Sequence, residues 1–147
     1  MASLKMANEP LRLNLEEYPH IPNSELFKII KVLPKLSSGG PWIAGGSVWR
    51  TVNNEPLDNC DVDVYFSCKS YYEQACRQMN SYPYVNSILS EKKNKWNTIY
   101  QVHVNEGKFD KTIDIQFIGM SYHKRLDSLL DSFDFPVCQF GMMVKTS

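Results

Sequence analysis

The residues from Asp61 to Phe66 alternate polar and apolar side chains, in the order Asp-Val-Asp-Val-Tyr-Phe. Successive side chains of a β-strand point to opposite faces, so Asp61 and Asp63 share one face while the two valines and Phe66 share the other. An unpartnered carboxylate is costly to bury, so a pair on one face is expected to meet solvent or a cation. The segment therefore predicts a half-buried strand whose polar face offers a divalent-cation site.

A second segment, residues 112–117, repeats the pattern. Its apolar side chains alternate with polar ones, in the order Thr112, Ile113, Asp114, Ile115, Gln116 and Phe117. If both strands lie in one sheet with their apolar faces on one core, Asp114 joins Asp61 and Asp63. Three carboxylates repel one another unless a cation neutralises them, and oxygen ligands without a histidine cluster favour Mg²⁺ or Mn²⁺ over zinc. We therefore predict Asp61, Asp63 and Asp114 as metal ligands and catalytic residues.

The bulk composition is that of an ordinary globular protein. The chain has 147 residues, 43% of them hydrophobic and 22% charged, and its 16 basic and 16 acidic residues cancel. A neutral chain has no basic surface over the whole molecule, so tight nonspecific binding of nucleic acid is not implied, and a local basic patch stays open. The four cysteines form no C-x-x-C pair, so neither a zinc site nor a disulfide framework is indicated. Without a signal peptide or a membrane span, the expected protein is soluble and cytoplasmic.

The chain is expected to hold one domain over residues 24–147, preceded by an N-terminal arm over residues 1–23. Periodicity and turn residues predict helices over 24–33, 47–53, 69–80 and 121–133, and strands over 42–44, 61–66, 85–89, 98–104, 111–118 and 137–144. The two strands on either side of Asn-Glu-Gly-Lys are expected to pair as an antiparallel hairpin. The predicted fold class is α/β (α+β), a mixed sheet with flanking helices.

A Gly-Gly-Ser turn at residues 45–47 joins the first predicted strand to the second predicted helix. Glycines let a ligand approach the backbone closely, and free N–H groups at a helix N-terminus hold phosphate oxygens. Gly45, Gly46 and Ser47 are therefore predicted to bind the phosphates of a nucleotide, with the Ser47 hydroxyl as a further donor. Arg50 is either a triphosphate ligand or a surface arginine.

Taken together, the Gly-Gly-Ser turn, Asp61-Val62-Asp63 and Asp114 resemble the DNA polymerase beta-type nucleotidyltransferase superfamily over about residues 42–118. The resemblance implies a palm-like sheet and two-metal transfer of a nucleoside monophosphate from a nucleoside triphosphate, with release of pyrophosphate. Asp61 and Asp63 would bridge the metals, and Asp114 would hold the metal that activates the acceptor hydroxyl. The acceptor would be an RNA end, a protein or a small molecule.

Two alternatives to this enzyme stay open at the level of sequence. One is a catalytically inactive module of the same fold that binds a nucleotide or a partner, because fold alone does not establish function. The other is the catalytic part of a larger enzyme, whose acceptor-binding region lies elsewhere. Affinity for nucleoside triphosphate that depends on Mg²⁺ would favour the enzyme over the binding module.

Overall fold

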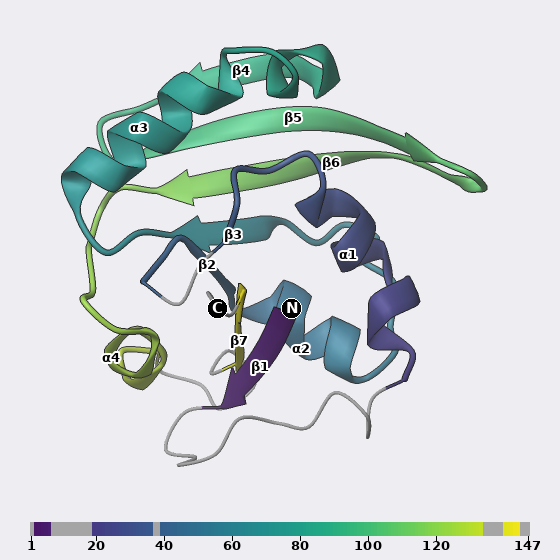
Figure 1. Cartoon of the computed structure of the whole chain (residues 1–147), viewed down its shortest axis with the longest axis horizontal. Coiled ribbons are helices and arrows are strands. Elements are labelled where there is room, and N and C mark those ends of the chain that lie inside the picture. The colour runs from purple at the N-terminus through teal and green to yellow at the C-terminus, as the bar shows by residue number, and fades with distance from the viewer. Residues whose placement is uncertain (1, 7–18, 37–38, 134–139, 145–147) are drawn as a thin grey trace.

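The computed structural model describes residues 2–6, 19–36, 39–133 and 140–144 (Figure 1). These residues form one seven-stranded sheet with the strand order β1-β7-β2-β3-β6-β5-β4. The strands are β1 (Ala2–Met6), β2 (Trp42–Ala44), β3 (Val62–Tyr65), β4 (Ile88–Lys93), β5 (Asn97–Glu106), β6 (Phe109–Ile118) and β7 (Phe140–Val144). Neighbouring strands are antiparallel except β3 and β6, which are parallel.

The helices flank this sheet. They are α1 (Glu25–Ile30), α2 (Gly46–Val52), α3 (Lys69–Met79) and α4 (Leu126–Asp131), with short 3-10 turns η2 (Ile21–Asn23) and η3 (Tyr84–Ser87). In Figure 1, β4, β5, β6 and β3 follow one another from the top, with α3 and α1 beside them. The predicted mixed α/β sheet with flanking helices is confirmed.

The main hydrophobic core lies between one face of the sheet and helices α1 and α3. The side chains of β3 and β6 that the alternation placed on the apolar face are buried: Val62, Val64, Ile113, Ile115 and Phe117. They pack with Leu26 and Ile29 of α1 and with Tyr72, Ala75 and Met79 of α3. The residues of opposite parity, which include Asp63 and Asp114, must therefore lie on the other face.

A second, smaller core covers part of that other face. Leu126, Leu129 and Leu130 of α4 pack on Trp42 and Ala44 of β2, next to the half-buried Tyr65. Helix α4 thus shields the sheet near the end of β3 that carries Tyr65. Asp114 on β6 is exposed, so the polar face around it is open.

Most predicted elements lie where the sequence placed them, and two do not. The predicted helix over 121–133 begins only at Leu126, because residues 121–125 are not helical and Arg125 precedes the first turn. The predicted strand over 85–89 is mostly the turn η3, and the true strand β4 runs on to Lys93, through residues for which no strand was predicted. Residues 2–6 of the expected arm form β1, which pairs with β7. The start of the last predicted strand, residues 137–139, lies outside the described residues.

Candidate functional site

Asp63 and Asp114 lie on the adjacent parallel strands β3 and β6, and Asp61 directly precedes β3. Val62 of β3 pairs with Ile115 of β6, and Asp61 and Asp114 each directly precede these partners. Asp63, two residues beyond Asp61, is opposite Gln116. The structure therefore brings all three aspartates to neighbouring positions on the open face, with Asp61 and Asp114 exposed and Asp63 half-buried.

The carboxylates influence one another electrostatically. Burial and, to a smaller extent, the neighbouring charge of Asp61 together raise the pKa of Asp63 from 3.8 to about 6. The pKa of Asp61 is also raised, first by partial burial and then by the charge of Asp114. Within the described part of the chain, no hydrogen-bond donor or cationic side chain pairs with any of the three carboxylates. Among the described residues, nothing compensates the negative charge of this patch.

These carboxylate ligands suit a hard cation that keeps part of its hydration shell better than a cation that protein ligands fully surround. No three His, Cys, Asp or Glu side chains of the described residues converge closely enough to hold one metal ion as they stand. Mg²⁺ usually keeps several waters and is bound through one or two carboxylates, so it does not require a cage of protein ligands. Asp61 and Asp63, spaced two apart on one strand, are the pair that could provide these ligands, with Asp114 beside them.

A hollow of about 520 Å³ lies between the loop that enters β3 and the first half of β6. Its lining residues are Leu57, Asp58, Asn59, Lys111, Thr112 and Ile113. None of the three aspartates is among these lining residues, so the hollow is adjacent to Asp61 and Asp114 only in sequence.

The Gly-Gly-Ser turn lies against the same patch. Gly45 has φ = 97°, a conformation that side-chain-bearing residues rarely adopt, and a Cβ atom there would lie 3.9 Å from Oδ2 of Asp63. Gly46 is exposed and faces open space. The Ser47 hydroxyl is buried without a hydrogen-bond partner among the described residues. The predicted roles of these three residues and Arg50 in binding nucleotide remain predictions.

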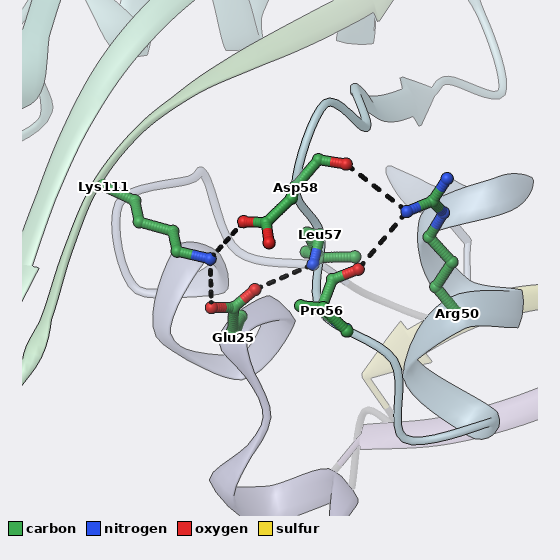
Figure 2. Close-up of polar contacts among 6 residues, drawn as sticks. All are labelled: Glu25, Arg50, Pro56, Leu57, Asp58 and Lys111. Atoms are coloured by element: carbon green, nitrogen blue, oxygen red, sulfur yellow. Dashed lines mark hydrogen bonds and ion pairs between the residues drawn. The ribbon is translucent and has the colours of Figure 1, made fainter.

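Arg50 is occupied by the loop that precedes β3. Its guanidinium donates hydrogen bonds to the carbonyl oxygens of Pro56 and Asp58, each at 3.4 Å (Figure 2). Because these carbonyls belong to the segment that leads into Asp61, Arg50 helps to hold the aspartate strand in place. The sequence left two interpretations of Arg50, a surface arginine or a triphosphate ligand. The contacts in the structure give this side chain a structural role.

A charged cluster that the sequence did not predict supports the same loop. Lys111 of β6 forms ion pairs with Asp58 at 2.6 Å and with Glu25 of α1 at 2.7 Å (Figure 2). Glu25 also accepts a hydrogen bond from the backbone N–H of Leu57 at 2.8 Å. The three charges come from distant parts of the chain, so no local pattern could have revealed them. Their hydrogen bonds raise the pKa of Lys111, with Asp58 contributing most.

Replacing Lys111 with methionine is expected to lower the free energy of unfolding by about 1–2 kcal/mol, because two carboxylates lose their shared cation in a partly exposed site. Urea denaturation measures the change. Lys108→Met, in the exposed turn of the same hairpin, is the matched control and should change stability by less than about 0.5 kcal/mol. Equal stabilities of the two variants would contradict a structural role for the cluster.

Comparison with known families places the chain. The model of the family described as Gad2, Gabija anti-defense 2 family protein, matches residues 21–147. The chain belongs to the Gabija anti-defense 2 family. No curated protein and no solved structure matches it.

Membership of the Gabija anti-defense 2 family corrects two predictions. The assignment to the DNA polymerase beta-type nucleotidyltransferase superfamily is wrong, because the matching family is a distinct anti-defense family. The predicted function, transfer of a nucleoside monophosphate to a hydroxyl acceptor, is overturned by the same match. The error arose because a Gly-Gly-Ser turn and three aspartates are too short a pattern to identify a family.

None of the helices among the described residues has the length and apolar character that crossing a lipid bilayer requires. The longest of them, α3, has 11 residues, whereas a membrane-spanning helix needs about 20.

Proposed function

We propose that this protein counteracts the Gabija defence and that it acts through the open acidic face of β3 and β6. The family match supports the first part of the proposal. The second part rests on one observation: Asp61, Asp63 and Asp114 occupy adjacent positions on an open face, with no cation or donor of the described residues beside them. Charge of this kind is costly unless a ligand compensates it.

The compensating ligand that we propose is Mg²⁺ or Mn²⁺, held by Asp61 and Asp63 with Asp114 as an outer partner. Structural metal sites are typically closed by protein ligands, whereas catalytic ones keep open positions. The open surroundings of these aspartates therefore favour an enzymatic use of the ion. Because Mg²⁺ commonly joins carboxylates to phosphates, the proposed substrate class is a phosphate-bearing molecule, nucleoside triphosphates included.

The proposed location is the cytoplasm. Cys60, Cys68 and Cys76 are free thiols, and free thiols are typical of the reducing interior of a cell. Fractionation of cells that make the protein, followed by detection with an antibody, would test the location.

The test of the proposed function uses cells that carry the Gabija defence and are challenged with an infection that this defence blocks. Expression of the intact chain should restore the infection. The double variant Asp61→Asn/Asp63→Asn should fail to restore it at equal expression. Asp131→Asn, an exposed aspartate at the end of α4, is the control and should act as the unaltered chain does.

Metal binding is measured separately, on purified protein. Titration of Mn²⁺ followed by electron paramagnetic resonance should show binding to the intact chain and to Asp131→Asn, and loss of binding in Asp61→Asn/Asp63→Asn. Restored infection with the double variant would exclude the acidic face as the working surface. Unchanged Mn²⁺ binding in that variant would instead exclude these aspartates as the metal ligands.

A further inference from the structure

Strand β4 forms one edge of the described sheet. It pairs with β5 on one side, and no strand of the described residues pairs with its other side (Figure 1). Residues 89–93 are all exposed, and only Ile88 at the start of the strand is half-buried. An edge of this kind presents backbone N–H and C=O groups that another strand can use.

The hydrogen bonds of the hairpin identify which backbone groups point outward. The Asn94 N–H donates to the Asn97 carbonyl at 3.0 Å and closes the β4–β5 hairpin. Opposed pairs in an antiparallel ladder alternate between hydrogen-bonded and non-bonded, so Lys93 and Glu91 occupy non-bonded positions. Their N–H and C=O groups therefore point away from β5, toward the free side of the edge.

The side chains along this edge combine positive charge with apolar surface. Lys92, Lys93 and Lys95 lie within four residues, against one acidic residue, Glu91. Leu89 is 59% exposed and Trp96 is 50% exposed. The Lys95 ammonium lies 4.7 Å from the centre of the Trp96 ring, which keeps this aromatic surface next to the positive charge.

The charge decides between two kinds of partner. Two copies of this edge would bring six lysines together against two glutamates, and like charges on opposed strands are destabilising. Edge lysines are a common means of preventing such self-pairing. An acidic strand would be attracted instead of repelled, because its carboxylates would lie beside the lysines. Its backbone would at the same time form hydrogen bonds with the edge of the sheet. The edge is complementary to an acidic segment and not to itself.

We propose that the free side of β4 binds an extended acidic segment of a partner protein, which adds to the sheet as an eighth strand. The backbone groups of Glu91 and Lys93 supply the ladder hydrogen bonds, as in other cases of strand addition. Lys92 and Lys93 point to opposite faces of the strand, so each selects acidic side chains on its own face. Leu89 and Trp96 add exposed apolar surface at the two ends of this segment. This surface belongs to the opposite end of the sheet from β1 and β7, beyond the acidic patch.

The probe is a synthetic peptide of ten residues, blocked at both ends, in which pairs of valines alternate with pairs of glutamates so that both faces of the added strand carry carboxylates. Its titration into ¹⁵N-labelled protein is followed by NMR. Amide signals of residues 89–93 should shift, and the Glu91 and Lys93 amides should exchange more slowly with solvent. The control peptides are one in which lysine replaces glutamate and one in which alternate backbone nitrogens are methylated, and neither should bind.

Variants test the same surface from the side of the protein. Lys93→Glu should weaken binding of the acidic peptide about tenfold, because an attractive pair becomes a repulsive one. Lys124→Glu makes the same charge change at an exposed position before α4 and should leave binding unchanged. Glu91→Pro removes one outward N–H at an edge position where proline is tolerated, and should abolish binding while signals outside β4 keep their positions.

Several results would overturn the proposal. One is the absence of shifts in β4 at millimolar acidic peptide, and another is equal binding of the acidic and methylated peptides. Concentration-dependent dimerisation that Glu91→Pro abolishes would assign the edge to a second copy of the chain. Shifts in β4 caused by a ten-nucleotide single-stranded RNA, with none caused by the peptide, would assign it to nucleic acid.

Discussion

Asp63→Asn is expected to stabilise the metal-free protein by about 3 kcal/mol at pH 7.5, since the pKa of this half-buried carboxyl rises from 3.8 to about 6 on folding. Burial and the charge of Asp61 both oppose ionisation of Asp63 in the folded state. Asparagine keeps the size of the side chain without the charge. The figure is an upper value, because the side chain keeps some contact with water.

The sign of the pH dependence follows from the number of protons that each state binds. Between about pH 4 and pH 6, folded Asp63 holds a proton that the unfolded chain has released. The free energy of unfolding of the intact chain therefore falls as the pH rises through this interval and stays constant above it. The free energy of unfolding of Asp63→Asn does not fall in this interval. The two proteins should therefore be equally stable near pH 4, and the difference between them should grow toward pH 7.5.

Urea denaturation in the presence of EDTA, at several pH values, measures the difference. Added Mg²⁺ should reverse the order, because a ligand that binds only the folded state stabilises it and the variant lacks a ligand group. Asp131→Asn is the control and should follow the intact chain at every pH. Parallel stability curves for Asp63→Asn and the intact chain would show that the Asp63 carboxyl is not destabilised by folding.

The parts of the fold that the sequence predicted best are those with a buried face. The alternation around Asp63 and Asp114 predicted both strands and the division of their side chains between the two faces. The apolar face of residues 69–80 likewise predicted α3, which runs from Lys69 to Met79. Burial leaves a periodic record in the sequence, because apolar residues must recur with the period of the element.

Strand β4 was missed for the same physical reason. Its residues are exposed along almost the whole strand, so nothing in Glu-Lys-Lys distinguishes it from a solvated loop. The backbone of β5, and not a buried side-chain pattern, determines that this segment is extended. An edge strand of this kind becomes recognisable only when its neighbour in the sheet is known.

The sequence likewise predicted one part of the candidate site and missed another. The proximity of Asp61, Asp63 and Asp114 followed from strand alternation and one assumption about adjacency, which the parallel pairing of β3 with β6 satisfies. The cluster of Glu25, Asp58 and Lys111 depends on contacts across 53 or more residues, and no local signal encodes it. Family membership was not predictable from the motif either, since the matching family model spans residues 21–147 as a whole.

Phe117→Ala is expected to lower the free energy of unfolding by about 3–5 kcal/mol, which is a large part of the stability of a domain of this size. Phe117 is fully buried on the core face of β6. Its ring packs edge to face on Phe66 and on Tyr100, with ring centres 5.4 Å and 5.1 Å apart. Alanine leaves a cavity between the central strands, which the sheet cannot close by moving a single side chain.

Thermal denaturation should show a fall in the melting temperature of roughly 10–15 °C for Phe117→Ala. Phe117→Leu retains most of the buried volume and should lose less than half as much stability, and Trp96→Ala, which truncates an exposed ring, should lose little.

The polar face gives a further contrast, because Phe117 and the aspartates lie on opposite faces of the sheet. The folded fraction of Phe117→Ala should therefore bind Mn²⁺ as tightly as the intact chain, whereas Asp61→Asn/Asp63→Asn should lose the ion and keep its fold. If Phe117→Ala abolished Mn²⁺ binding in protein that is still folded, the core face and the acidic face could not be treated as independent.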